Sequence, residues 1–189
     1  NQILVTLNMT LSISIDEANE TYWLMMFESF YGPFQMTLND VYLTSTCVLR
    51  DQLSPILFKN ASIGNLVFNS FKNSSLCKQF LNFADEEEDL AYIHANIEAN
   101  VEKVYFDNAF NLALNRKLLN RFVFRQLKEI SYLGTLDGIE EDLFLSFNAL
   151  RNIYLMLKNL RNFWHSSSTN QNKWLRSLNS HVKDVDIFK

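Results

Sequence analysis

Glycine and proline are scarce in this chain, and the scarcity limits the turns that its backbone can make. The 189 residues include 4 Gly and 2 Pro, whereas the tight hairpins of an all-β sandwich or barrel depend on these two residue types. Long helices need few of them. We therefore predict an all-α fold, a helical bundle. We also predict one domain over residues 1–189, because this length suits a single hydrophobic core.

A stretch without helix breakers leads from Asn82 to Gly134 and predicts the longest helix. Its start carries the acidic run Asp85 to Asp89, which the helix macrodipole favours near an N-terminus. The pattern predicts a helix over about residues 84–133. The apolar residues that follow one another at helical spacing are Leu90, Ile93, Ile97, Val101, Val104, Tyr105, Ala109, Leu112, Leu119, Val123 and Ile130.

The residues after Gly134 predict a second long helix, over about residues 139–165. Asp137 and Glu140 have the spacing of a capping box at its start. Because the connection is short, we expect the two helices to form a long antiparallel hairpin. The apolar face of the second helix would consist of Leu143, Phe147, Leu150, Tyr154, Leu157 and Trp164.

The segments outside this hairpin are also predicted to be mainly helical. Residues 3–15 alternate apolar and polar side chains as a strand does, but they also present one helical face. A helix is favoured because a lone strand would have no partner, and an N-terminal strand is the alternative. Residues 38–53 predict a helix, residues 56–83 two short helices, and a short amphipathic helix includes Trp174. No repeat with a period of 20 to 50 residues is visible, so a solenoid is not expected.

Cysteines and glycosylation sequences give information on whether the protein is secreted or intracellular. Cys47 and Cys77 permit one disulfide, and two reduced thiols are the alternative. The N-x-[ST] pattern of N-glycosylation acceptors occurs four times, all before residue 74. The chain begins without Met, as a mature or excised segment does. These features predict a secreted or extracellular glycoprotein. The four acceptor positions are Asn8, Asn19, Asn60 and Asn73.

No pattern typical of catalysis or of a cofactor is present. His94, Glu98 and Glu102 would share one helical face, but the Glu-x-x-His and H-E-x-x-H spacings of metal sites are missing. The sequence also lacks G-x-S-x-G and any glycine-rich phosphate loop. We therefore expect neither an enzyme nor a bound metal or cofactor.

Charge and hydropathy exclude two further classes. The formal net charge of −4 argues against nucleic-acid binding, which depends on Lys and Arg neutralising phosphates. The local basic residues are interpreted as solvated side chains. No run of about 18 apolar residues is present, so no membrane span is expected within this chain. The local basic residues are Arg116, Lys117, Arg121, Arg125 and Lys128.

These observations favour a protein that acts by binding a protein receptor or ligand. The leading hypothesis is an extracellular helical-bundle glycoprotein, either a cytokine-like ligand or the ligand-sensing ectodomain of a membrane protein. A carrier of lipid or another apolar small molecule is one alternative, because the chain contains 16 Phe. An intracellular helical adaptor is the other.

Overall fold

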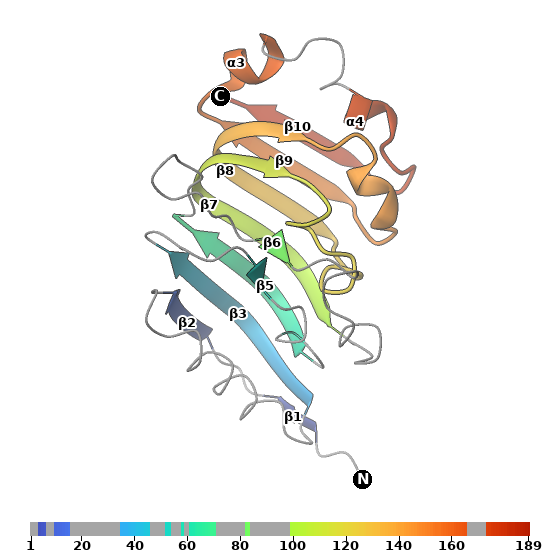
Figure 1. Ribbon diagram of the computed structural model, residues 1–189. Helices are drawn as coiled ribbons and strands as arrows, with labels where there is room; N and C mark the ends of the chain where they lie inside the picture. The colour runs from blue at the N-terminus through green and yellow to red at the C-terminus, as the bar shows by residue number, and fades with distance from the viewer. Residues whose placement is uncertain are drawn as a thin grey trace.

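A parallel β-sheet is the main feature of the computed structural model (Figure 1), which describes residues 4–6, 10–15, 35–45, 52–53, 58, 61–70, 82–83, 99–165 and 173–189. Eight strands of the described residues belong to this sheet. Their bounds are β1 Leu4–Thr6, β2 Thr10–Ile15, β3 Gln35–Ser45, β5 Ala61–Asn69, β7 Asn100–Leu114, β8 Glu129–Ile139, β9 Asn152–Leu157 and β10 Asp184–Phe188. A small second sheet pairs β4 Gln52–Leu53 with β6 Asn82–Phe83.

The prediction of an all-α helical bundle is wrong, because the fold is α/β and dominated by its sheet. The described helices are short: the 3-10 helix η2 Leu143–Ser146, and the α-helices α3 Leu160–His165 and α4 Lys173–Arg176. The predicted helix over residues 84–133 instead contains β7 and the start of β8, and the one over 139–165 contains η2, β9 and α3. The predicted antiparallel hairpin is also wrong, since β8 and β9 pair in parallel.

Among the other predicted elements, the N-terminal strand is the alternative that the structure supports. Within residues 3–15, β1 and β2 both pair in parallel with β3, so neighbouring strands supply the partner that the sequence did not reveal. The predicted helices over 38–53 and 56–83 are wrong where the structure describes them, because β3, β4 and β5 lie there. The short helix that includes Trp174 is confirmed as α4.

The strands follow one another across the sheet in chain order, so the chain coils as a solenoid. From β3 onward the order is β3, β5, β7, β8, β9, β10, from blue to red in Figure 1. Each connection must therefore return the chain to the end of the sheet where the previous strand began. Paired residues lie one turn apart in the chain, although the length of a turn varies, from 23 residues between Glu129 and Asn152 to 38 between Asn65 and Lys103. The expectation that the chain has no repeat is therefore wrong.

Each turn of the solenoid sends three apolar side chains inward with the same spacing. The second inward residue follows the first after three residues, and the third follows two residues after that. The inward residues are buried in the first five turns and half-buried in the last. The six triplets are Leu38, Val41, Leu43; Ile63, Leu66, Phe68; Val101, Val104, Phe106; Leu127, Ile130, Tyr132; Leu150, Ile153, Leu155; and Val182, Val185, Ile187.

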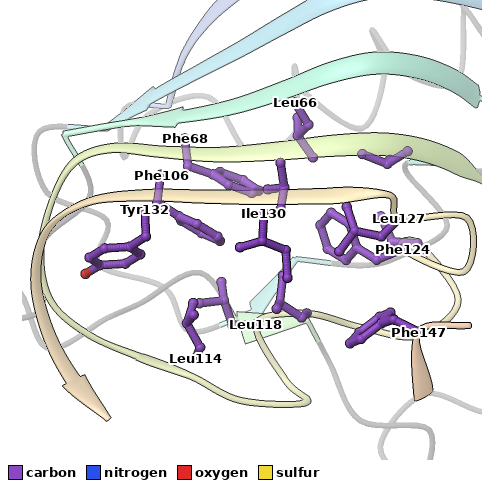
Figure 2. Close-up of a cluster of buried hydrophobic side chains, with 14 of the residues drawn as sticks. Leu66, Phe68, Phe106, Leu114, Leu118, Phe124, Leu127, Ile130, Tyr132 and Phe147 are labelled. Atoms are coloured by element: carbon purple, nitrogen blue, oxygen red, sulfur yellow. The ribbon is translucent and has the colours of Figure 1, made fainter. Parts of the chain in front are cut away.

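The hydrophobic core lies between the inner face of the sheet and the connections (Figure 2). On the sheet side, Phe106 stacks on Phe68 with ring centroids 5.2 Å apart and lies 5.7 Å from the ring of Tyr132. These three rings occupy paired positions of β5, β7 and β8. Apolar side chains from the end of β7 and from the connections close the core from the other side, including Leu114, Leu118, Phe124, Leu127, Leu143, Phe144, Phe147 and Trp174.

Asparagines occupy special positions within β7 and in the connection after β9. Asn108 and Asn111 have φ angles of 51° and 55° and lie where the β7 register shifts against β8. Asparagine tolerates this left-handed conformation better than most residues do. The Asn159 side chain accepts from the Leu136 N–H and donates to the Leu136 carbonyl, both at 3.0 Å. It thereby pairs with the backbone of the previous turn.

Candidate functional site

A row of outward-facing side chains crosses the sheet at its centre, and three of them are tyrosines. Because alternate residues of a strand point to opposite faces, the residue between the second and third inward positions points outward in every turn. The register aligns these residues side by side from β3 to β10. We name them the tyrosine row: Tyr42, Val67, Tyr105, Ser131, Tyr154 and Asp186.

A second row, the polar row, lies two residues earlier along each strand. Asn65 donates to the Asp40 carboxylate at 2.6 Å. Glu129 accepts a hydrogen bond from the Tyr105 hydroxyl at 2.9 Å, and its other oxygen lies 3.8 Å from Lys103 Nζ. The two rows are therefore connected by side-chain contacts at β7 and β8. The polar row consists of Asp40, Asn65, Lys103, Glu129, Asn152 and Asp184.

An apolar row lies on the other side of the tyrosine row, over the last three strands. Leu133, Met156 and Phe188 are aligned there by the register of β8, β9 and β10. Met156 is 48% exposed and Phe188 is 49% exposed. Large side chains of this kind are normally covered in a folded protein when they lie next to one another. Their exposure makes this part of the sheet a candidate contact surface.

Two tyrosines of the sheet face, Tyr105 and Tyr154, have raised pKa values. Partial burial, followed by the hydrogen bond to Glu129, raises the pKa of Tyr105 to about 12. Partial desolvation raises the pKa of Tyr154 as well, and the nearby carboxylates of Glu129, Asp184 and Asp186 add to this effect. Both hydroxyls are therefore neutral at physiological pH and can donate or accept hydrogen bonds. This favours recognition over a nucleophilic role.

The raised pKa of Tyr105 predicts a pH dependence of stability. The folded state holds this proton up to about pH 12, whereas the unfolded chain releases it near the ordinary tyrosine pKa of 10.0. The stabilisation is therefore complete below pH 10 and is lost as the pH rises toward 12. We expect the difference in free energy of unfolding between wild type and Tyr105→Phe to shrink over this interval. Urea titrations at several pH values between about 9 and about 11.5 measure it.

The Glu129→Gln variant separates the contribution of the Glu129 carboxylate to the raised pKa of Tyr105 from the contribution of burial. It removes the negative charge but keeps a hydrogen-bond acceptor, so the pKa of Tyr105 should fall only part of the way toward its ordinary value. The loss of stability should then begin at the same pH, near 10, but be smaller and be complete at a lower pH than in wild type. A difference between wild type and Tyr105→Phe that stays constant with pH would contradict the hydrogen-bonded geometry.

The residues singled out for oxidation and glycosylation lie outside the described part of the chain. The described residues contain no disulfide, and Cys47 and Cys77 lie outside them. The four predicted acceptors, Asn8, Asn19, Asn60 and Asn73, also lie outside them. The pairing of the cysteines and the occupancy of the acceptors stay predictions from sequence.

The structure does not bring the three possible metal ligands of the sequence analysis together within the described residues. His94 and Glu98 lie outside the described residues, and Glu102 forms an ion pair with Lys128 at 2.7 Å. Within the described segments, no three His, Cys, Asp or Glu side chains are placed to hold a metal ion.

The predicted capping box and basic helix are replaced by contacts between turns. Asp137 and Glu140 begin no helix, since Asp137 belongs to β8. Glu140 accepts from the Arg116 backbone N–H at 2.8 Å and forms an ion pair with its guanidinium at 3.1 Å. Arg121 lies over the ring of Phe122, and its guanidinium carbon is 5.0 Å from the ring centroid. The basic residues therefore line the connections between strands and the start of β8.

Sequence analysis missed the tyrosine row altogether. Tyr42, Tyr105 and Tyr154 are far apart in the chain and only the register of the sheet aligns them. The signal that could have found them is the repeated spacing of three and then two residues between apolar positions, because each tyrosine lies between the last two of a triplet.

Comparison with known proteins gives no guide to this face. Family models, curated proteins and solved structures were compared with the chain, and none of the three comparisons finds a match. None of the helices in the described residues is long and apolar enough to cross a membrane.

Proposed function

We propose that this protein acts by binding a protein partner on the exposed face of its parallel sheet. The observation that carries the proposal is the tyrosine row, which places Tyr42, Tyr105 and Tyr154 on one solvent-facing surface. Tyrosine has only two side-chain torsions to order and offers both a ring and a hydroxyl, and it is enriched where proteins contact one another. A surface of this kind suits recognition of another protein.

The architecture supports the same proposal. Parallel sheets are usually covered on both faces, but here the connections cover one face and the tyrosine row lies on the other. Solenoids of stacked turns use such extended surfaces to bind partners. The triplet spacing is similar to the first part of the leucine-rich repeat pattern, in which strands line one side of a horseshoe. The likeness is one of spacing and architecture.

A carrier of lipid has less support from the core. Phe68, Phe106 and Tyr132 pack against one another, and the apolar side chains of the connections face them (Figure 2). The phenylalanines that suggested a carrier thus contribute to a packed interior. An extracellular location remains part of our proposal, and it rests on the acceptor sequences before residue 74.

The test compares a variant of the tyrosine row with a matched variant of the connections. Proteins captured by the wild-type chain are identified, purified and titrated against Tyr105→Ala/Tyr154→Ala. We expect Kd to rise at least about 10-fold for the true partner, because buried tyrosines often contribute more than about 1.4 kcal/mol each. The control is Arg125→Ala/Gln126→Ala, which changes two exposed residues of the connection before β8 and should leave Kd unchanged.

Circular dichroism of both variants establishes that the sheet is intact before Kd is compared. A purified partner that binds the tyrosine variant as tightly as wild type would contradict the proposal. So would a partner whose affinity falls only in the connection variant, because it would contact the opposite side of the solenoid.

A further inference from the structure

The geometry points to a partner segment in which Arg or Lys side chains lie beside apolar ones, bound on the outward side chains of β8, β9 and β10. We name these side chains the C-terminal patch. This inference rests on the proposed function and specifies the chemistry of the partner. The inference is supported by the order of side chains along β8, β9 and β10, where carboxylates come first, Tyr154 next and apolar side chains last.

The patch has an excess of negative charge. Asp184 and Asp186 on β10 have no ion-pair partner among the described residues. Glu129 is shared between Lys103 and the Tyr105 hydroxyl. The carboxylates therefore present charge that a cationic partner would complement.

The nearest cations of the chain do not neutralise this charge. Lys128 pairs with Glu102 at 2.7 Å. The Arg151 guanidinium donates to the carbonyls of Asn148 and Leu150, at 3.2 Å and 3.1 Å, at the end of the connection before β9. Lys183 is exposed and directly precedes β10. Lys128, Arg151 and Lys183 therefore lie at the start of the strands, on one border of the patch, whereas Lys158 and Lys189 follow the ends of β9 and β10.

Tyr154 lies at the centre of the patch. The register places Ser131 and Asp186 on either side of it, and the carboxylates of Glu129, Asp184 and Asp186 are close enough to contribute to its raised pKa. An aromatic ring among carboxylates suits a guanidinium or ammonium group, which gains from both the ring face and the negative charge.

The apolar row requires that the partner also have apolar side chains. Leu133, Met156 and Phe188 lie two residues beyond the tyrosine row on their strands, which corresponds to roughly 7 Å. An extended segment with alternate side chains facing the sheet has the same spacing. A cation at one position and an apolar side chain two residues later would then meet Tyr154 and Met156 together.

Fluorescein-labelled peptides of about ten residues test this chemistry, with spacings chosen from the strand repeat. In the first peptide every second residue is Ser, and the residues between them, which face the sheet, are Arg, Arg, Leu and Leu. The second has Glu in place of Arg, and the third has Ser in place of Leu. Fluorescence anisotropy with the full chain, at low and physiological salt, should show the first peptide binding at least about 10-fold more tightly than either control.

Matched variants locate the binding. Asp184→Asn/Asp186→Asn should weaken the Arg–Leu peptide about 10-fold and flatten its salt dependence. Met156→Ser/Phe188→Ser should weaken it at both salt concentrations. Glu141→Gln/Asp142→Asn makes the same charge change in the connection after β8 and should leave binding unchanged.

Equal binding of the Glu and Arg peptides would overturn the inference, and so would equal binding of the Arg–Leu peptide to wild type and to all variants. Self-association in sedimentation that the patch variants abolish would also overturn it, because the occupant would then be a second copy of the chain. A purified partner that needs Tyr105 and Tyr154 but is indifferent to Asp184→Asn/Asp186→Asn would refute this inference alone and leave the proposed function standing.

Discussion

Replacing Gly134 with alanine is expected to prevent folding or to lower the free energy of unfolding by more than about 3 kcal/mol. Gly134 is buried in β8 at a φ of +150°, a conformation that residues with a side chain rarely adopt. A Cβ there would lie 1.7 Å from the carbonyl oxygen of Ala109 and 2.7 Å from its carbonyl carbon. Both atoms belong to the backbone of β7, so relief requires that the two strands separate.

Gly138→Ala is the matched control, because Gly138 lies four residues later in the same strand without a positive φ. Urea titration followed by circular dichroism measures both variants. We expect Gly138→Ala to remain close to wild type. If Gly134→Ala unfolds at the same urea concentration as wild type, the close approach of β7 and β8 at this position is incorrect.

Truncation of Phe106 to alanine is expected to cost about 3–5 kcal/mol, the range typical for a buried phenylalanine. Phe106 is 1% exposed and contacts the rings of Phe68 and Tyr132. Its removal leaves a cavity between three turns of the solenoid and deletes two ring contacts. Neighbouring side chains on the paired strands cannot close this space without moving the sheet.

Leu145→Ala provides the comparison for this prediction. Leu145 is a large apolar residue of η2, but it is 49% exposed, so its truncation should change stability by less than about 0.5 kcal/mol. Both variants are measured by the same urea titration. Similar midpoints for the two variants would mean that Phe106 does not lie in the core.

Sequence reasoning identified many buried residues correctly while assigning them to the wrong secondary structure. Val101, Val104, Leu143, Phe147 and Leu150 were predicted to be buried, and all five are at most 1% exposed. The reason is geometric: a separation of three residues joins neighbours on a helix face and also joins the first two inward positions of each turn here. The apolar periodicity within one turn of the solenoid therefore does not distinguish a helix from the strand and its preceding residues.

The repeat was hidden by unequal connections and by varied side chains. Paired residues are 23 positions apart between Glu129 and Asn152, but 38 apart between Ser62 and Asn100. A search for one fixed period averages over such differences and finds nothing. The third inward position is Leu43, Phe68, Phe106, Tyr132 or Leu155 in successive turns, so identity between repeats is low even where the packing role is the same.

The scarcity of glycine and proline was misinterpreted for a related reason. It excludes hairpins, but parallel strands need no hairpin because long connections join them. Within β7, asparagine provides conformations that glycine often provides, at Asn108 and Asn111. The candidate face depends on the register of six strands, and single-sequence reasoning contains no information about that register.

The arrangement of contacts in the sheet also determines how the protein can come apart. Within the main sheet, the extensive contacts between described strands are those of paired neighbours, such as β3 with β5, β5 with β7 and β7 with β8. The free energy of unfolding of such a chain is approximately the sum of the stabilities of the single turns and of the interfaces between neighbouring turns. The terminal strand β10 has one neighbour and an exposed, acidic outer face, whereas β7 and β8 are held on both sides. Unfolding is therefore expected to begin at strands that have one neighbour, and amide hydrogens of β10 should exchange before those of β8.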